Sequence, residues 1–259
     1  MARFKLTIEY EGTAYKGWQM NKGEVTVQGK LIDVCESIFG KEKLELYGAG
    51  RTDAGVHATG QVAHLDVVTN LKPLQIQHKI NDFLPATINI LSVEQANPRF
   101  HARHHATARS YVYVISQRRS ALFKKNVWWI KDTLDVEAMR KSSKLFLGLK
   151  DFRSFGRVTK QDESTKVEIQ HIGIHQQGSA IVIHIIGSHF LWNQVRRMIG
   201  VLVEVGRGTM NASHITEFMT NESDRPSQLT APPSGLYLDH VYYDNEKPSI
   251  HPTIPVTIP

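Results

Sequence analysis

The sequence predicts an α+β protein built from two tandem ferredoxin-like units, each with the order βαββαβ and an antiparallel sheet. Two observations lead to this fold class. Both halves pass from strand-type alternation to helical spacing in the same order, and glycine or proline ends most of the helical segments. A length of 259 residues is enough for two units. We expect one unit at 1–100, a second at 101–245 and a proline-rich tail at 246–259.

The first half begins with FKLTIEY at 4–10, where apolar and polar residues alternate as in a strand. The next segment, 26–40, carries apolar residues at helical spacing and ends at Gly40, a residue type that often follows a helix. The remaining elements expected in this half are strands at 44–50, 61–67 and 88–93 and a helix at 74–84.

The second half repeats this order. A helix is expected at 135–148, with Asp135 as its N-cap and Gly148 as its C-cap, and another at 189–206. A turn at Gln177-Gly178 joins two of the strands. The strands expected here are 111–116, 167–174, 179–186 and 235–243, with a further short helix at 212–219.

The net charge indicates either a polyanion partner or only a soluble surface, and the distribution of the basic residues favours the polyanion. Lysine and arginine number 31 against 25 acidic residues, which gives a net charge of +6 and a pI near 9.3. The stretches 99–111 and 192–198 hold arginines beside aromatic residues and contain no acid. A single cysteine, Cys35, excludes an internal disulfide, and no apolar run approaches the roughly 18 residues of a membrane span. We therefore expect a cytoplasmic protein without membrane contact.

The segment GAGRTDAGVHATGQ, residues 48–61, is the strongest candidate for a reactive site. Asp53 lies between two expected strands in a loop rich in glycine, where the backbone turns tightly and a bulky ligand can come close. From the residues alone, this carboxylate is a nucleophile, a general base or a turn cap. The segment lacks the spacing of a phosphate-binding loop and that of a calcium loop.

Three histidines, His101, His104 and His105, suggest a zinc site, but no cysteine is near and arginines interleave. Contact with RNA phosphate or a solvated loop fits them better, so we expect no bound metal. Acidic pairs of the kind used in glycoside hydrolysis occur in polar turns that favour a solvated surface; they are Asp132 with Asp135 and Asp162 with Glu163.

Two further side chains have both structural and functional interpretations. Tyr111 begins an expected strand, where packing alone would explain it. Arg196 and Arg197 lie in an expected helix beside the apolar Val195 and Met198, so one of them borders the inner face and needs a carboxylate partner.

These residues together resemble the TruA-type tRNA pseudouridine synthases. GAG followed by RTDAGVHATGQVAHLD, residues 48–66, is similar to the signature of that family. Further similar segments follow in the family's order over nearly the whole chain: 9–19, 100–115, 151–156, 189–200 and 231–243. Gln194 and Trp192 depart from the usual helix motif, which commonly has methionine before V-R; such residues flank the pocket and bear on the choice of RNA.

The resemblance implies a cofactor-free isomerisation, in which a uridine is detached at N1–C1′, turned and rejoined through C5. Asp53 would attack C1′ of the ribose or C6 of the base, Tyr111 would stack on the base and help to remove the C5 proton, and Arg196 would pair with Asp53 in a cleft between the units. The residues expected to bind the flipped nucleotide are Arg51, His57, Arg103, Arg109 and Tyr111.

The resemblance also implies a partner and an assembly. The expected substrate is the anticodon stem-loop of tRNA, around positions 38–40, and the expected assembly is a homodimer. Three alternatives stay open: another RNA target, a non-catalytic RNA-binding protein on the same scaffold, and a metal-dependent hydrolase that uses His101, His104 and His105.

Overall fold

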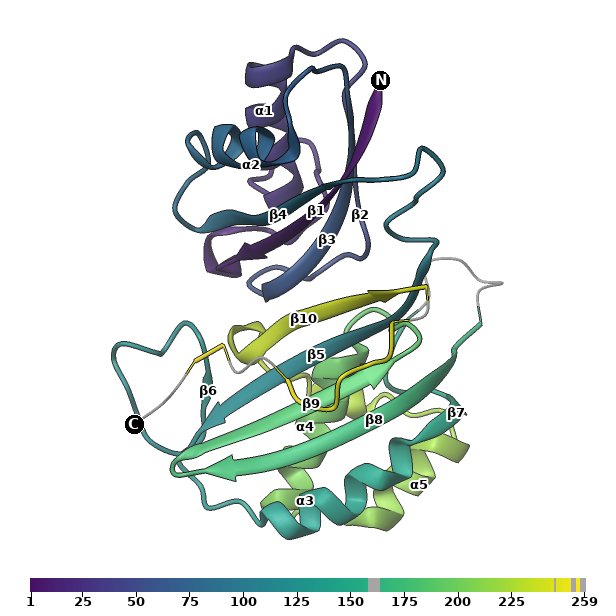
Figure 1. Cartoon of the computed structure of the whole chain (residues 1–259). Coiled ribbons are helices and arrows are strands. Elements are labelled where there is room, and N and C mark those ends of the chain that lie inside the picture. Colours follow the sequence, from purple (N-terminus) through teal and green to yellow (C-terminus); the bar gives the residue numbers. More distant parts are fainter. Residues whose placement is uncertain (158–163, 245, 253–254, 257–259) are drawn as a thin grey trace. The chain divides into compact units, whose positions relative to one another are not determined.

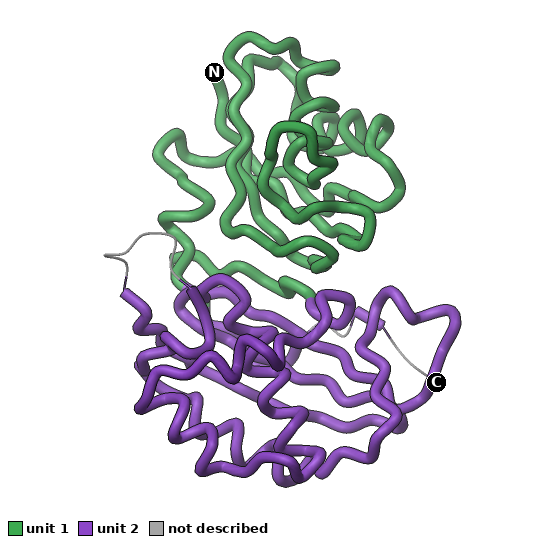
Figure 2. The backbone as a smooth tube through the Cα atoms, turned by 180° about the vertical axis from the view of Figure 1, so that it is seen from behind, with its two compact units in different colours: residues 1–107, 237–246 green, residues 108–236, 247–259 purple. Residues whose placement is uncertain are grey.

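The computed structural model describes residues 1–157, 164–244, 246–252 and 255–256, and backbone contacts divide the chain into two compact units (Figure 2). Unit 1 comprises residues 1–107 and 237–246, and unit 2 comprises residues 108–236 and 247–259. The sequence-based boundary after residue 100 lies seven residues earlier than this division. The return of residues 237–246 to unit 1 was not expected, and it follows from parallel pairing of Tyr237 and Leu238 with His57 and Ala58.

Unit 1 contains strands β1 (Ala2–Tyr10), β2 (Glu45–Gly48), β3 (His57–Val67) and β4 (Ile88–Gln95), with most of β10 (Leu236–Tyr243). Strand β1 lies between β3 and β4 and is antiparallel to both, while β2 is antiparallel to β3. Helices α1 (Val27–Phe39) and α2 (Pro73–Asn81) lie side by side over these strands (Figure 1).

The alternation in the first strand determines the core of unit 1. Phe4, Leu6, Ile8 and Tyr10 are all buried, whereas the residues between them are partly exposed. Helix α1 begins after Thr26, whose side chain accepts a hydrogen bond from the Gly29 amide; it ends before Gly40, as expected.

Unit 2 contains strands β5 (Ala106–Ser116, of which the first two residues belong to unit 1), β6 (Trp128–Trp129), β7 (Gly148–Asp151), β8 (Lys166–Gln177) and β9 (Ala180–Gly187). Strand β9 lies between β5 and β8 and is antiparallel to both, and β7 continues the sheet beside β8. Gly178, with φ +57°, makes the expected turn between β8 and β9.

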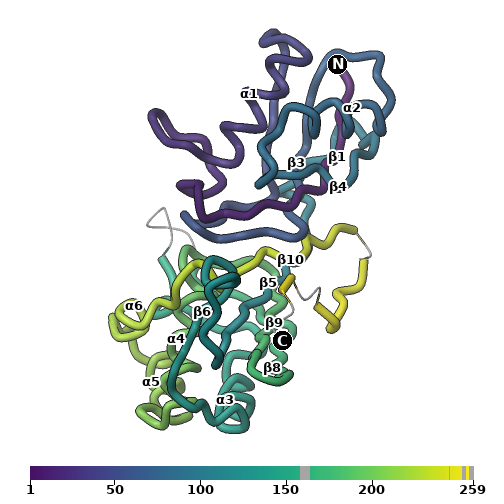
Figure 3. The backbone as a smooth tube through the Cα atoms, turned by 90° about the vertical axis from the view of Figure 1, so that its left-hand side faces the viewer, coloured from purple at the N-terminus to yellow at the C-terminus, as the bar shows by residue number. Residues whose placement is uncertain are grey.

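The helices of unit 2 are α3 (Val136–Ser143), α4 (Gln194–Gly206), α5 (Ala212–Thr220) and the short α6 (Arg225–Gln228). Helix α3 packs on α4 and α5 (Figure 3). The described residues also form single 3-10 turns at Gly12–Ala14, Lys144–Phe146 and Pro233–Gly235. No helix in the described ranges is both long and apolar enough to cross a bilayer.

Three expected helices begin late or end early, and one of them, expected at 74–84, ends at Asn81. The helix expected from 189 begins only at Gln194, because Asn193 before it has a left-handed φ of +63°. The helix expected to reach Gly148 ends at Ser143 and a 3-10 turn, because Gly148, with φ +88°, starts a strand that pairs with β8. The structure otherwise confirms a mixed protein of helices and largely antiparallel strands.

Candidate functional site

The loop that carries Asp53, residues 49–56, connects β2 to β3 in unit 1 and is named here the RTD loop. Backbone hydrogen bonds hold this loop immediately before and after the half-buried Asp53. The Trp18 amide donates to the Thr52 carbonyl at 3.1 Å, and the Val56 amide donates to the Asp53 carbonyl at 3.2 Å. The hydroxyls of Thr52 and Tyr10 lie 2.7 Å apart, which ties the loop to β1. These bonds fix the backbone from which the Asp53 carboxylate projects.

The turn at residues 11–18 is packed directly against the RTD loop. Gly17 has φ +99°, and a Cβ there would lie 2.6 Å from the Thr52 carbonyl oxygen and 3.3 Å from the Ala54 nitrogen. A Cβ at Gly12 would collide with the Val56 carbonyl. Both glycines are therefore required by the close approach of two backbones. This explains why the segment EGTAYKGW accompanies the RTD loop in the sequence.

Arg51 and His57, both expected to bind substrate, lie in different surroundings. Arg51 is exposed, and its Nε donates to Gln19 Oε1 at 3.0 Å. His57 exposes only 1% of its surface; its Nδ1 accepts a hydrogen bond from the Gly12 amide at 3.0 Å, and its ring stacks on Tyr237 at 4.7 Å. The structure thus buries His57 between the turn at 11–18 and Tyr237 of β10.

Sequence reasoning missed three residues that hold the RTD loop: Tyr10, Thr52 and Gln61. The buried Gln61 donates from Nε2 to the Gly50 carbonyl at 3.1 Å, while its Oε1 accepts from the Val62 amide. The available signal was a polar amide directly before the apolar Val62 and Ala63 of β3, because a buried amide needs such partners.

In unit 2, Tyr111 and Arg109 lie on β5 and contact the segment that follows β9. The half-buried Tyr111 ring meets Phe190 edge to face, with centroids 5.1 Å apart. The Arg109 guanidinium donates to the Ser188 carbonyl at 3.0 Å. Strand β5 and residues 188–190 therefore form one surface that combines an aromatic ring with a cation.

The two adjacent arginines of α4 differ in environment. Arg196 is half-buried, and its guanidinium donates to the Ala231 carbonyl at 2.7 Å and to Asn193 Oδ1 at 2.9 Å. Arg197 exposes 6% of its surface, and its burial, then the nearby Arg157, lowers the pKa of its guanidinium. The sequence predicted that one of this pair borders the inner face; Arg197 is the more buried.

The third segment with expected site residues is 101–105, in unit 1. Arg103 is exposed, and its amide and that of His104 both donate to His101 Nδ1. The His101 ring lies 4.2 Å from His104 and 4.7 Å from His64, between ring centroids. Across the residues that the structure describes, no group of three or more potential ligands is arranged to hold a metal ion.

The remaining alternatives for reactive groups have structural roles. Asp132 accepts from Arg207 Nε at 2.9 Å, and Asp135 caps α3 by accepting from the Ala138 amide at 2.9 Å. Asp162 and Glu163 lie outside the described residues. Cys35 is fully buried, which raises the pKa of its thiol to about 12. Asp132 and Asp135 are exposed but bound to these donors, and the buried Cys35 lacks the exposure that a nucleophilic thiol needs.

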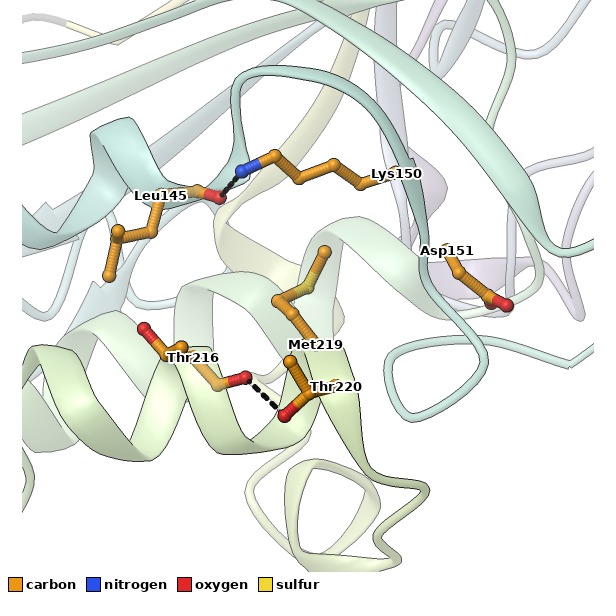
Figure 4. A pocket seen from close by; sticks show the side chains of 6 residues that line it. All are labelled: Leu145, Lys150, Asp151, Thr216, Met219 and Thr220. Atoms are coloured by element: carbon orange, nitrogen blue, oxygen red, sulfur yellow. Dashed lines mark hydrogen bonds between the residues drawn. The ribbon is translucent and has the colours of Figure 1, made fainter.

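A cavity of about 330 Å³ opens in unit 2 between the 3-10 turn after α3, strand β7 and helix α5 (Figure 4). Lys150 donates across it to the Leu145 carbonyl at 2.6 Å. Hydrogen bonds from Arg153 lower the pKa of the Asp151 carboxyl to about 2. None of the expected site residues lines this cavity; its lining is Leu145, Lys150, Asp151, Thr216, Met219 and Thr220.

The family model described as tRNA pseudouridine synthase matches residues 6–105 and 143–244. The tRNA pseudouridine synthase A of Bartonella tribocorum is 39% identical over 94% of this chain and 100% of its own length. The tRNA pseudouridine synthase A 2 of Clostridium perfringens is 36% identical over the same shares. The tRNA pseudouridine synthase A of Methylocella silvestris is 38% identical over 94% of this chain and 99% of its own.

Proposed function

Because the chain belongs to the tRNA pseudouridine synthase family, whose members are isomerases, we propose that it converts uridine to pseudouridine in tRNA with the Asp53 carboxylate as nucleophile. The observation that carries the proposal is the RTD loop. Asp53 is a half-buried carboxylate on a backbone bonded on both sides, packed against a turn that admits only glycine at positions 12 and 17. Such rigidity holds a nucleophile in the orientation that attack requires.

Two routes are open to this carboxylate, and both balance without a cofactor. In the first, an Asp53 oxygen bonds to C1′ as the N1–C1′ bond breaks and the uracil leaves with the electron pair. The base turns, C5 bonds to C1′, the carboxylate is expelled, C5 loses its proton and N1 gains one. In the second, an Asp53 oxygen adds to C6, the N1–C1′ bond breaks with its electron pair on N1, the base turns and C5 bonds to C1′. C5 then loses its proton as the carboxylate leaves C6 and the C5–C6 double bond returns, and N1 gains a proton.

Arg196 and Tyr111 are the proposed partners of Asp53 in catalysis. An arginine near a carboxylate in a dry pocket favours the ionised form, which is the nucleophilic one. The Arg196 guanidinium suits this role because a backbone carbonyl and Asn193 already orient it. We expect the base to stack on the half-buried Tyr111 ring, which Phe190 holds by an edge-to-face contact. Arg51, Arg103 and Arg109 supply cations for phosphate contacts, whereas we expect His57 to act through the RTD loop.

The strand pairing in each unit supports a ferredoxin-like fold. In unit 1, β1 pairs with β3 and β4, and β2 pairs with β3, all antiparallel, which is the pairing of a ferredoxin-like sheet. In unit 2, β9 pairs with β5 and β8 in the same sense. We propose that the two units are tandem copies of this fold and that each contributes residues to catalysis.

For the substrate, we propose the anticodon stem-loop of tRNA, around positions 38–40, bound by a homodimer. A net charge of +6 and the arginines beside Tyr111 support a folded RNA as partner. Sedimentation of the chain would test the dimer: a species of one 29.3 kDa chain across the micromolar range would contradict it.

Carbodiimide mapping of pseudouridine tests the activity and the position together. Unmodified tRNA transcripts are incubated with the wild-type chain, Asp53→Asn and Asp53→Ala, and the RNA is then mapped. We expect modification in the anticodon stem-loop by the wild type only, while both variants still bind the RNA. Modification by Asp53→Asn would reject the nucleophile, and modification only elsewhere would reject the target. Binding without modification by the wild type would favour a non-catalytic RNA-binding protein.

A further inference from the structure

Trp192 is an exposed indole immediately before helix α4, in unit 2. It exposes 55% of its surface, although large aromatic side chains are mostly buried in folded proteins. An isolated exposed aromatic residue needs no explanation by itself. The structure around Trp192 is what indicates a function.

The backbone of Trp192 is held in place by hydrogen bonds to Arg157. The Trp192 amide donates to the Arg157 carbonyl at 3.3 Å, and the Arg157 amide donates to the Trp192 carbonyl at 3.4 Å. A Cβ at the preceding Gly156 would collide with the Leu191 side chain, so the two segments can approach this closely only because residue 156 is glycine.

The residues after Trp192 fix the turn from its other side. Asn193 has φ +63°, an uncommon conformation for a residue with a side chain, and its Oδ1 accepts from Arg196 at 2.9 Å. Gln194 is fully buried, and its Oε1 accepts from the Leu191 amide at 2.9 Å. The Trp192 indole therefore projects from a turn that hydrogen bonds hold on both sides. Asn193 in this turn also binds Arg196, the proposed catalytic arginine.

The charge beside this indole is positive. Arg157 is exposed and pairs with Trp192 through the backbone, and Arg196 lies in the first turn of α4, four residues further along the chain. Arg197 is more than nine-tenths buried, and its Nε has no hydrogen-bond partner in the described part of the chain. Among the described residues, Asp224 raises the pKa of Arg197, whereas burial and the positive charges of Arg157 and Arg196 lower it. A ring face among arginines matches an unstacked nucleotide, which offers a base to stack and a phosphate to neutralise.

We propose that Trp192 is a stacking platform for an unpaired nucleobase of the substrate RNA outside the isomerised uridine, and that Arg157 contacts a phosphate beside it. The inference rests on the proposed function, because it takes the RNA substrate from there. It makes Trp192 a specificity residue, since a base must leave its neighbours in the RNA to reach the indole. The two departures from the usual helix motif, Trp192 and Gln194, then act together. Gln194 stabilises the turn on which the Trp192 indole is exposed.

Substitution of Trp192 in the full chain tests the platform. The Kd for an unmodified tRNA transcript is measured for the wild type, Trp192→Ala and Trp192→Phe, and KM and kcat are measured on the same RNA. Loss of one base–aromatic stack converts to a Kd and KM about 5-fold to about 100-fold higher in Trp192→Ala, with kcat within about threefold of the wild type. Trp192→Phe recovers most of the affinity because it retains a ring.

Trp129→Ala is the matched control, since Trp129 is 42% exposed on β6 of the same unit with the Arg119 guanidinium 5.5 Å from its ring. We expect this variant to bind like the wild type. Equal losses in the two alanine variants, or wild-type affinity in Trp192→Ala, would overturn the proposal. A melting temperature of Trp192→Ala far below that of the wild type would assign the residue a structural role instead.

The salt dependence of Kd distinguishes the contribution of the Trp192 ring from that of the Arg157 cation. Arg157→Gln should reduce the slope of log K against log salt by about 0.7 to 0.9, the value for one phosphate contact, whereas Trp192→Ala should leave the slope unchanged. An unchanged slope in Arg157→Gln would remove Arg157 from the proposal. Kd is measured without turnover, so it tests the stacking platform alone. If the proposed function is wrong, the wild type binds RNA but forms no pseudouridine, which is a separate result.

Discussion

At the scale of single residues, the surroundings of Asp53 were only partly predictable. The glycines near Asp53 in the sequence indicated a tight turn, and Gly55 has the positive φ, 78°, of such a turn. The close backbone approach depends on Gly12 and Gly17 of the neighbouring turn, which the loop's own composition does not indicate. The burial of His57 was not predictable, because its partners Gly12 and Tyr237 are 45 and 180 positions away in the sequence. Local composition indicates which backbone conformations a loop can adopt, whereas the burial of a side chain depends on segments that are distant in the sequence.

Arg196 provides a test of the proposed ion pair. Arg196→Lys keeps the positive charge but loses the two fixed hydrogen bonds to Ala231 and Asn193. Arg196→Ala loses the charge as well as the two hydrogen bonds. We expect kcat to fall at least about 100-fold in Arg196→Ala, as for loss of one electrostatic catalytic group, and less in Arg196→Lys. Single-turnover kinetics with saturating tRNA would check this. An Arg196→Ala rate within about threefold of wild type would exclude the pair from catalysis.

His64 links the stability of unit 1 to pH. Burial, then the positive charge of Arg3, lowers the pKa of His64 to about 4, below its ordinary 6.5. Between these values the unfolded chain binds a proton at this site and the folded chain does not, so acid favours unfolding. The free energy of unfolding should therefore fall from pH 6.5 to pH 4, by at most about 1.4 kcal/mol per pH unit from this group.

The variant His64→Gln removes the titration but keeps an acceptor for the Ala102 amide, which His64 Nδ1 binds at 3.2 Å. Denaturant titrations at pH 7, 5.5 and 4.5 should show a shallower decline for this variant than for the wild type. Parallel declines would show that His64 does not control the acid sensitivity.

At the scale of elements, the order of helices and strands could be predicted, but several ends could not. Apolar spacing located α1, α4 and most strands, since periodicity reports which side is buried. It extended α4 backward to 189 because Leu191 continued the pattern, although Asn193 breaks the helix. The cause is a hydrogen-bonded partner, Arg157, that the helical pattern cannot reveal.

Gly17 and Gly23 test the packing of the RTD loop as a matched pair. Both have positive φ, +99° and +80°, but a Cβ at Gly17 would meet the Thr52 carbonyl, while nothing lies within 4 Å of a Cβ at Gly23. Gly23→Ala should cost only the backbone strain, about 1–2 kcal/mol. Gly17→Ala should cost about 1–3 kcal/mol more, as for overpacking, and should also lower kcat by moving the loop.

Thermal unfolding and turnover of the two alanine variants would check this difference. Equal stability and equal activity would mean that the turn at 11–18 does not hold the RTD loop.

At the scale of the whole molecule, length and element order predicted two α+β units, but not that residues 237–246 belong with unit 1. That assignment depends on the pairing of β10 with β3, two strands that are far apart in the sequence. A local sequence pattern does not indicate such a pairing. Net charge is the other whole-molecule property that the sequence determines, and it bears on RNA binding directly.

The affinity for tRNA should be strongly salt-dependent. Phosphate contacts release counterions, so we expect the affinity to fall at least about tenfold between 50 mM and 200 mM monovalent salt. Filter binding at several salt concentrations measures the slope. A change of less than about twofold would contradict docking led by the arginines.

The central claim is that the Asp53 carboxylate performs the isomerisation, and release of tritium from [5-³H]uridine-labelled tRNA tests it most directly, because C5 loses its hydrogen only when it bonds to C1′. With saturating RNA, the wild type should release one tritium per modified uridine. Asp53→Asn should bind the same RNA and release none. Tritium release by Asp53→Asn at a rate within about tenfold of the wild type would contradict the account.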